Sequence, residues 1–378
     1  MASSATSSPA PASLGLGLVG RGGLLLLADD EHTSSPPPTP LPGLMRLRCA
    51  VQHYDWGRRG ADSLVARLAA ADAAPDGRPC AELWMGTHPT APSSLAPDVS
   101  LRDWVARNPA ALGRNVAARW GGDLPFLFKV LSVAKALSIQ AHPDRDLARA
   151  LHALRPDAYR DANHKPEMAV AITEFRALCG FVATQELKEV LKTVPEVRDL
   201  VGKEDAAKLM SVKEQNEGIG VRPYLQSAFT NLMAANEEVV SEAISKLKCR
   251  LDGESKVRAL TKKEKLVLSL ERQYPGDVGV LAAFFFNYVK LNPGEALYVG
   301  ANEPHAYLSG DCIELAGPSI FLVMTGKGEI KAGSVPDEAK LKEGNIFFVP
   351  AYTEVNLLAS GPGCMQLYRA GVNSIFFS

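Results

Sequence analysis

Four polar residues in three separate segments have the types and spacing of a metal site. Gln140 and His142 are two positions apart, so in an extended strand both side chains point to the same face. Glu167 and His305 would add a carboxylate and a second imidazole. Nitrogen and oxygen ligands without a thiolate suit zinc or a similar divalent ion that keeps a position for water or substrate. Taken singly, each residue is more simply a hydrogen-bonded polar side chain, so the metal site depends on their convergence.

Five longer motifs around these residues are more specific. In chain order they are VQHYDWG (51–57), AELWMGTHP (81–89), LSIQAHPD (137–144), HKPEM (164–168) and EPHAY (303–307). Together they resemble the type I mannose-6-phosphate isomerases, and the resemblance runs from about Met45 to the C-terminus. It implies a mainly β fold with α-helices, in which cupin-type β-sandwich or barrel domains carry an inserted helical domain. It also implies a zinc-dependent enzyme that interconverts mannose 6-phosphate and fructose 6-phosphate through an enediol or enediolate.

The resemblance implies a role for each candidate site residue. It assigns one Zn²⁺ per chain to Gln140, His142, Glu167 and His305, and catalytic roles to Lys165 and Glu314. The substrate-binding residues that it implies are Trp56, Glu82, Lys129, Ser138 and Tyr307. Without the resemblance, several of these residues have plainer interpretations: Lys165 as an exposed lysine, and Trp56 and Tyr307 as core aromatic residues.

Two lysines have positions that suit chemistry. Lys165 lies two residues before Glu167, so on a strand it would share the face of the proposed ligand. A divalent ion nearby would disfavour the ammonium form of Lys165, which suits proton transfer or phosphate binding. Lys129 interrupts the apolar run 124–131, which indicates either a buried, paired lysine or one that faces a substrate cleft.

The resemblance is interrupted after Glu314. The family continues there with a segment that contains a catalytic arginine, whereas here Glu314 runs into 315–320, which resembles the family's C-terminal cupin strand. No arginine occurs between His305 and Tyr368. Loss of a guanidinium is expected to weaken transition-state stabilisation, and loss of strands is expected to leave unpaired sheet edges.

Three functions are compatible with this pattern. The first is an active isomerase that feeds GDP-mannose synthesis and glycosylation, and this is the function that we expect. The second is a catalytically impaired, zinc-binding variant, which the missing arginine favours. The third is a non-enzymatic cupin-like protein, against which the four retained ligands and Lys165 argue.

Composition excludes several other classes. A formal net charge of −1 over 378 residues gives no sign of a nucleic-acid or anionic membrane partner. No run of 18 apolar residues predicts a membrane-spanning helix. Six cysteines without a Cys-x-x-Cys pair indicate reduced thiols, which fits a cytoplasmic protein. The expected partner is a small sugar phosphate, and the oligomeric state is left open.

The chain is expected to have four segments. Residues 1–44, rich in Ala, Ser, Pro, Gly and Leu, predict a disordered leader, and the single basic residue Arg21 argues against a targeting peptide. The expected remainder is the first part of the catalytic domain at 45–181, a helical domain at 182–280, and cupin-type strands at 281–378, with a block missing near 314–318.

Local patterns predict the elements that must position the site. Apolar runs at 126–131 and 168–172 predict strands, and 64–71 and 101–107 predict short helices. From Thr184 to about Tyr274 the apolar period becomes helical. The helical stripes contain Leu187, Val190, Leu191, Val194, Phe229, Leu232 and Met233, and 261–264 has capping-box spacing. Strands are expected again from Leu281.

Overall fold

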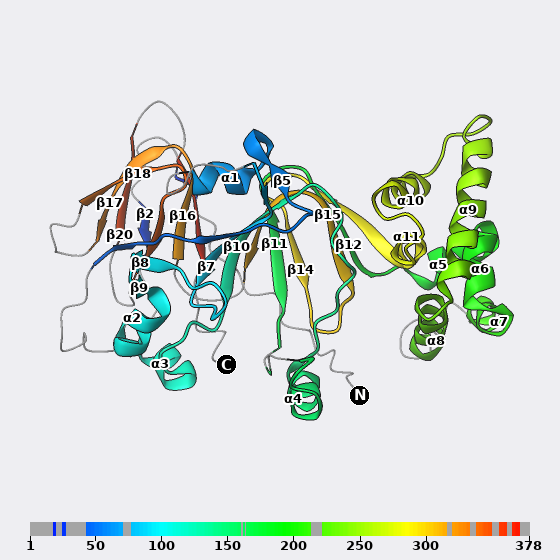
Figure 1. Ribbon diagram of the computed structural model, residues 1–378, viewed down its shortest axis with the longest axis horizontal. Helices are drawn as coiled ribbons and strands as arrows, with labels where there is room; N and C mark the ends of the chain where they lie inside the picture. Colours follow the sequence, from blue (N-terminus) through cyan, green and yellow to red (C-terminus); the bar gives the residue numbers. More distant parts are fainter. Residues whose placement is uncertain are drawn as a thin grey trace, which may run out of the picture. The chain divides into compact units, whose positions relative to one another are not determined.

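The computed structural model describes residues 18–19, 25–27, 43–70, 77–159, 162, 164–212, 221–315, 320–332, 338–349, 355–360 and 365–370. The chain divides into two compact units, one made of Met1–Ser132 with Cys312–Ser378 and the other of Val133–Asp311. Extensive β-sheets with an inserted helical block confirm the expected fold class (Figure 1). Within the described ranges, no helix combines the length and the apolar character needed to cross a bilayer.

Three antiparallel strands of the first unit carry a polar face. They are β4 (Ala50–Gln52), β7 (Glu82–Gly86) and β10 (Leu127–Val133), with β7 in the middle. In their register Lys129 lies opposite Trp84, and Leu131 lies opposite Glu82. Since alternate residues share a face, Glu82, Trp84 and Lys129 point to the same side of these strands.

Short helices of the first unit begin where serine caps them. Ser63 accepts a hydrogen bond from the Ala66 amide at the start of α1 (Leu64–Ala69), and Ser100 does so for Asp103 in α2 (Leu101–Arg107). The expected helices at 64–71 and 101–107 therefore exist. The remaining short elements of this part are β5 (Arg58–Arg59), η1 (Gly60–Asp62), β6 (Pro79–Cys80), β8 (Ser94–Ala96), β9 (Val99–Ser100), η2 (Pro109–Leu112) and α3 (Arg114–Trp120).

The C-terminal part of the first unit is a sandwich of two sheets. One sheet has the order β1-β21-β16-β19-β3, and the other has the order β18-β17-β20-β2. The strands are β1 (Leu18–Val19), β2 (Leu25–Leu27), β3 (Met45–Arg46), β16 (Ile320–Thr325), β17 (Lys327–Ala332), β18 (Glu338–Lys342), β19 (Ile346–Phe348), β20 (Val355–Ser360) and β21 (Met365–Ala370). Buried side chains of both sheets, among them Phe321, Ile330 and Leu357, form one hydrophobic cluster between them.

Two expectations for this region need correction. Strand β1 pairs with β21 and strand β2 pairs with β20, so the expected disordered leader does not extend to these five residues. The rest of 1–42 lies outside the described residues. Strand β16, the first described element after the interruption, pairs with β19 on one side and β21 on the other. The unpaired edge expected from the missing block therefore does not occur at β16.

Five strands of the second unit hold the candidate metal ligands. They are β11 (Glu167–Ala171), β12 (Phe175–Phe181), β13 (Phe286–Leu291), β14 (Ala296–Val299) and β15 (His305–Leu315), whose last residues belong to the first unit. Strand β12 lies between β13 and β15, and β11 pairs with both β14 and β15. The strand expected after Glu167 starts one residue earlier, so that Glu167 itself is part of it. Helix α4 (Arg145–Leu154) comes before these strands in the second unit.

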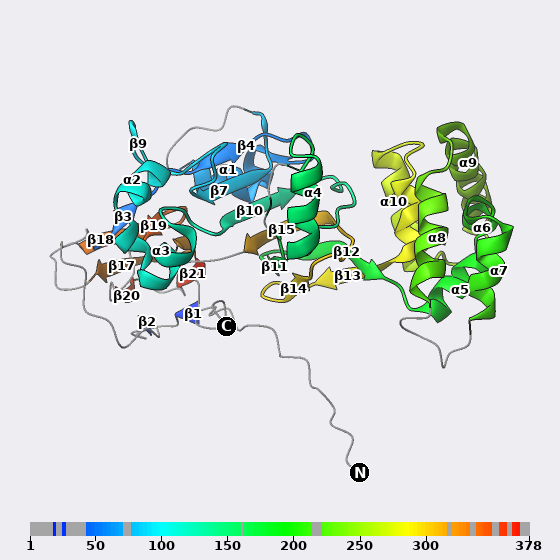
Figure 2. The ribbon, with the colours of Figure 1, turned by 90° about the horizontal axis from the view of Figure 1, so that it is seen from below.

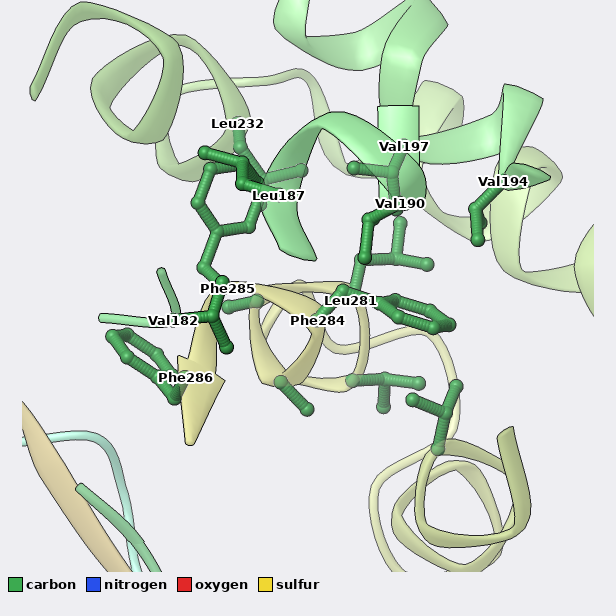
Figure 3. Close-up of a cluster of buried hydrophobic side chains, with 14 of the residues drawn as sticks. Val182, Leu187, Val190, Val194, Val197, Leu232, Leu281, Phe284, Phe285 and Phe286 are labelled. Carbon is green, nitrogen blue, oxygen red and sulfur yellow. The ribbon is translucent and has the colours of Figure 1, made fainter. Parts of the chain in front are cut away.

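The helical block of the second unit has its own hydrophobic core. It contains α5 (Thr184–Thr193), α6 (Pro195–Val201), α7 (Lys203–Ser211), α8 (Arg222–Met233), α9 (Glu237–Glu254), α10 (Lys262–Gln273) and α11 (Gly279–Ala282). Figure 2 shows these helices gathered beyond the ends of β12 and β13. In Figure 3, Leu187, Val190 and Val197 lie against Leu281, Phe284 and Phe285. The expected stripe from Leu187 to Val194 is buried, and Thr261 and Glu264 form the expected capping box.

Two details of the helical block were predicted incorrectly. Leu281 belongs to helix α11, and a 3₁₀ turn (η4, Ala283–Phe285) follows, so the strands resume only at Phe286. Burial against the helices at the end of the block outweighs the strand preference of this apolar, aromatic run. Met233, expected in the buried stripe of α8, is 40% exposed at the last residue of that helix.

Candidate metal centre

Three of the four candidate ligands meet in the second unit. One ligand atom from each of His142, Glu167 and His305 lies within 4.8 Å of the other two. Nε2 of His142 is 3.0 Å from Oε1 of Glu167, and Nε2 of His305 is 3.3 Å from Oε2 of the same carboxylate. The carboxylate therefore lies between two imidazoles, with one oxygen directed at each. Glu167 and His305 are buried, and His142 is half-buried.

Backbone pairing places Gln140 beside this cluster. The amides of Gln140 and His305 each donate to the other residue's carbonyl, at 2.9 and 2.8 Å. Residues paired in this way lie directly opposite each other, as in an antiparallel ladder, with their side chains on one face. The pairing therefore places the backbone of Gln140 opposite that of the candidate ligand His305, and the role of the Gln140 side chain as a fourth ligand stays a prediction.

The hydrogen bonding of the two imidazoles fits a bound cation. Nδ1 of His305 lies 3.1 Å from the Glu303 carbonyl oxygen and donates its N–H to it, so in the neutral imidazole the lone pair is on Nε2. Nε2 of His142 is buried and has no correctly oriented hydrogen-bond partner among the described residues, although Glu167 is near. Such a buried nitrogen is costly unless a cation satisfies it. Two imidazole nitrogens and a carboxylate are also a donor set typical of zinc.

Glu167 is the residue that connects the cluster. Burial raises the pKa of its carboxyl, but His142, His305 and Lys165 outweigh burial and hold that pKa well below its ordinary value. Nζ of Lys165 is 2.8 Å from Oε1, and the Tyr307 hydroxyl donates to Oε2 at 3.1 Å. The carboxylate therefore stays ionised, as a metal ligand must. Tyr307 is buried edge-on against Phe175, whereas the Lys165 side chain is 45% exposed.

A second polar cluster lies within the first unit. Nζ of Lys129 is 3.5 Å from Oε2 of Glu82 and 3.2 Å from Oε1 of Glu314, and all three side chains are at least 91% buried. Trp84 donates its indole N–H to Glu82 at 2.5 Å, and its ring centroid is 5.5 Å from the Lys129 ammonium. Burial and the nearby Glu314 raise the pKa of Glu82, while Lys129 and Trp84 oppose that rise. The buried carboxylates of Glu82 and Glu314 thus share the single ammonium group of Lys129.

The other predicted substrate-binding residues lie at the surface of their own units. Trp56 is half-buried and stacks on Tyr54, with ring centroids 5.7 Å apart. Ser138 is exposed, two residues before Gln140. The prediction from sequence missed Trp84, although its position two residues after Glu82 on a strand is the signal that could have found it.

The chain is similar, in sequence and in structure, to phosphomannose isomerases. Residues 44–184 match the catalytic domain of phosphomannose isomerase type I, and residues 200–286 match its helical insertion domain. Mannose-6-phosphate isomerase 1 of Arabidopsis thaliana is 44% identical over 414 positions, which cover 88% of this chain and 95% of the relative. The human mannose-6-phosphate isomerase is 44% identical over 298 positions, covering 75% of this chain and 70% of the relative. The isomerase from Salmonella typhimurium solved with fructose 6-phosphate and zinc aligns with a TM-score of 0.71 at 26% identity, over 87% of this chain and 100% of that one.

The plant relative is longer than this chain over the aligned region. The 414 positions of the alignment exceed the 378 residues of this chain, so part of the relative has no counterpart here. The similarity nevertheless extends over nearly the whole relative and both family domains. The chain therefore belongs to the type I phosphomannose isomerase family.

Proposed function

We propose that this chain is a zinc-dependent aldose–ketose isomerase that interconverts mannose 6-phosphate and fructose 6-phosphate in the cytoplasm and supplies GDP-mannose synthesis. The observation that carries the proposal is the buried Glu167 carboxylate between the His142 and His305 imidazoles. The relatives named mannose-6-phosphate isomerase, and the neighbour solved with zinc and fructose 6-phosphate, support the same reaction.

In this proposal Gln140, His142, Glu167 and His305 hold one zinc ion. When bound, zinc supplies a Lewis acid that polarises a sugar oxygen and stabilises the negative charge of an enediolate. Hydrogen bonds and an ion pair from neighbouring groups fix the orientation and ionisation of two of these ligands. The Glu303 carbonyl orients His305, and Lys165 and Tyr307 hold the Glu167 carboxylate in its ionised form.

The isomerisation also requires proton transfer, which side chains must carry out. We propose Lys165 and Glu314 as the catalytic residues. Lys165 combines contact with a proposed ligand and partial exposure, so its amine can reach both the metal cluster and a bound sugar phosphate. Glu314 and Glu82 share the Lys129 ammonium, and the pKa of Glu82 is raised. A buried group of two carboxyls and one amine, with a raised carboxyl pKa, is suited to proton transfer.

The remaining roles follow the same proposal. Trp56, Glu82, Lys129, Ser138 and Tyr307 would bind the substrate. The catalytic domain would begin at 45–181 and continue in the cupin-type strands of 281–378, with the helical domain of 182–280 inserted between them.

One observation favours a second candidate, a zinc-binding family member with impaired catalysis. The chain has no arginine between His305 and Tyr368, and part of its plant relative has no counterpart in it. A guanidinium that stabilises developing charge contributes orders of magnitude to a rate, so its loss would slow the reaction severely without removing the zinc ligands.

Turnover by the purified, zinc-loaded chain separates the two candidates. Mannose 6-phosphate is supplied, fructose 6-phosphate is detected by a coupled assay, and bound zinc is measured in parallel. We expect turnover that is lost in His305→Ala and Gln140→Ala but retained in His152→Ala, a histidine of helix α4 outside the metal cluster. A folded protein that holds zinc without turnover would establish the impaired variant. A folded protein that holds no zinc would refute both candidates.

A further inference from the structure

The loop before β15 contains an unusual backbone conformation. Asn302 has a φ of +63°, and it is the one residue other than glycine with a positive φ in the described part of the chain. Residues with a Cβ rarely adopt this region, and asparagine is among the few that tolerate it. A strained conformation three residues before a candidate ligand calls for a structural reason.

The reason lies in what Asn302 binds. Its backbone amide donates to the carbonyl of His142 at 2.7 Å. Its side-chain amide donates to Oδ2 of Asp144 at 2.9 Å, and its side-chain oxygen accepts from the Asp144 amide at 3.3 Å. One residue thus makes three hydrogen bonds to the segment that carries His142. Asp144 in turn caps helix α4 by accepting from Leu147 at 2.9 Å, so this segment is fixed from both sides.

The same loop also fixes His305. Three residues after Asn302, His305 pairs with Gln140 through two backbone hydrogen bonds, and its Nδ1 is oriented by the Glu303 carbonyl. The segments 140–144 and 302–305 are therefore joined at both ends, by the Gln140–His305 pair and by the Asn302 contacts. Gln140, His142 and His305 all lie on these two joined segments.

We infer that Asn302 is a positioning residue for the metal centre, which sets zinc affinity by holding the His142 segment against the His305 segment. The inference rests on the proposed zinc site, and it names a residue that touches neither the ion nor the substrate. Partners of metal ligands that orient the ligands typically change metal affinity by about 10- to 100-fold when they are removed.

The test compares three variants for zinc affinity, measured by competition with a fluorescent chelator. Asn302→Ala loses both side-chain hydrogen bonds and disfavours the positive φ, so we expect zinc to bind at least about tenfold more weakly. Asn302→Gly restores the backbone conformation without the side chain, so its affinity should fall between those of wild type and Asn302→Ala. Asn292→Ala is the matched control, because Asn292 is an exposed asparagine whose side-chain amide donates to the nearby Glu295 carboxylate in the turn after β13.

Two further readouts distinguish positioning from a general loss of stability. In the zinc-free protein, hydrogen exchange of the Asp144 amide should accelerate in Asn302→Ala and stay unchanged in Asn292→Ala. The increase in melting temperature that added zinc produces should be smaller in Asn302→Ala than in the wild type, whereas Asn292→Ala should show the full increase.

Three results would contradict the proposed role of Asn302 or the zinc site on which it rests. Zinc affinity and Asp144 exchange equal to those of wild type in Asn302→Ala would overturn that role. Equal losses of zinc affinity in Asn302→Ala and Asn292→Ala would also overturn it. A wild-type chain that binds no zinc would refute the proposed function, and unchanged Asp144 exchange would then separately overturn the role of Asn302 in holding the two segments together.

Discussion

Replacement of Lys129 by methionine tests the buried charge cluster of the first unit. The ammonium lies 3.2 Å from Glu314 and 3.5 Å from Glu82, and none of the three side chains is more than 9% exposed. At an effective dielectric constant of about 20, each contact contributes roughly 5 kcal/mol of attraction. Burial of the charges opposes this by several kcal/mol per ion, so loss of the lysine alone should cost about 3–5 kcal/mol of unfolding free energy.

The cost should depend on pH in a defined direction. Burial and Glu314 already raise the pKa of Glu82 in the folded protein, and removal of Lys129 raises it further. A carboxyl with a raised folded pKa binds its proton more tightly in the folded state, so stability falls as pH rises from the unfolded pKa to the folded one. The Lys129→Met variant should therefore lose more stability at about pH 8 than at about pH 5.

Urea unfolding of both proteins at the two pH values measures this difference. Lys290→Met is the control, because Lys290 is 54% exposed and pairs with the exposed Glu174, so its loss should cost less than about 1 kcal/mol. Adding Glu82→Gln to Lys129→Met should recover part of the lost stability, since one of the two buried charges disappears. A Lys129→Met variant no less stable than Lys290→Met, or equally destabilised at both pH values, would refute the reasoning.

Three other substitutions address the metal centre and the fold of the second unit. Glu167→Gln removes the charged ligand between the two imidazoles, so zinc retained after dialysis should fall at least about tenfold by metal analysis. Arg250→Ala removes two hydrogen bonds to the buried Glu196, at 2.8 and 2.9 Å, and should cost about 3 kcal/mol in urea unfolding. Gly180→Ala places a Cβ 2.5 Å from Oε1 of Glu303 at a φ of +68°, so it should lower the melting temperature and zinc affinity together.

Each of these three predictions has a matched control variant. Glu174→Gln changes a carboxylate outside the metal centre and should leave zinc content unchanged. Arg198→Ala changes an arginine whose neighbour Asp199 is 75% exposed, and it should cost less than about 1 kcal/mol. Gly202→Ala also has a positive φ but no atom near its Cβ, so it should leave zinc affinity unchanged. Equal effects within any of these pairs would show that the contacts described here do not set the measured property.

Local sequence signals predicted those parts of the fold that local interactions determine. The capping box before α10 and the apolar run of β10 act over a few residues, so these elements were predicted correctly. The segment that starts at Leu281 was predicted as strand because its aromatic residues favour strands, but the structure buries it as helix and 3₁₀ turn up to Phe285 in the core of the helical block.

Sequence also indicated some residues of the candidate site and missed others. The spacing of Gln140 and His142 indicated a shared face, and residue type together with the motif resemblance indicated Glu167 and His305, which the structure brings together with His142. Asn302 was missed because its importance comes from a backbone conformation and from hydrogen bonds to residues about 160 positions earlier in the chain. No local pattern of residue types carries information about contacts over such separations.

The helical block is, in topological terms, the loop of a long β-hairpin. Strands β12 and β13 are antiparallel neighbours, and Phe181 lies opposite Phe286, so the chain leaves the sheet and returns to it at one position. Loop-closure entropy grows only slowly with the number of residues between such fixed ends, and this loop offsets its cost with its own hydrophobic core. The length and sequence of the block can therefore change during evolution while β12 and β13 keep their register, and with them the strand that begins at His305. A shortened chain in which a tight turn joins Phe181 to Phe286 is a direct way to ask how much of the metal centre the sheet can build alone.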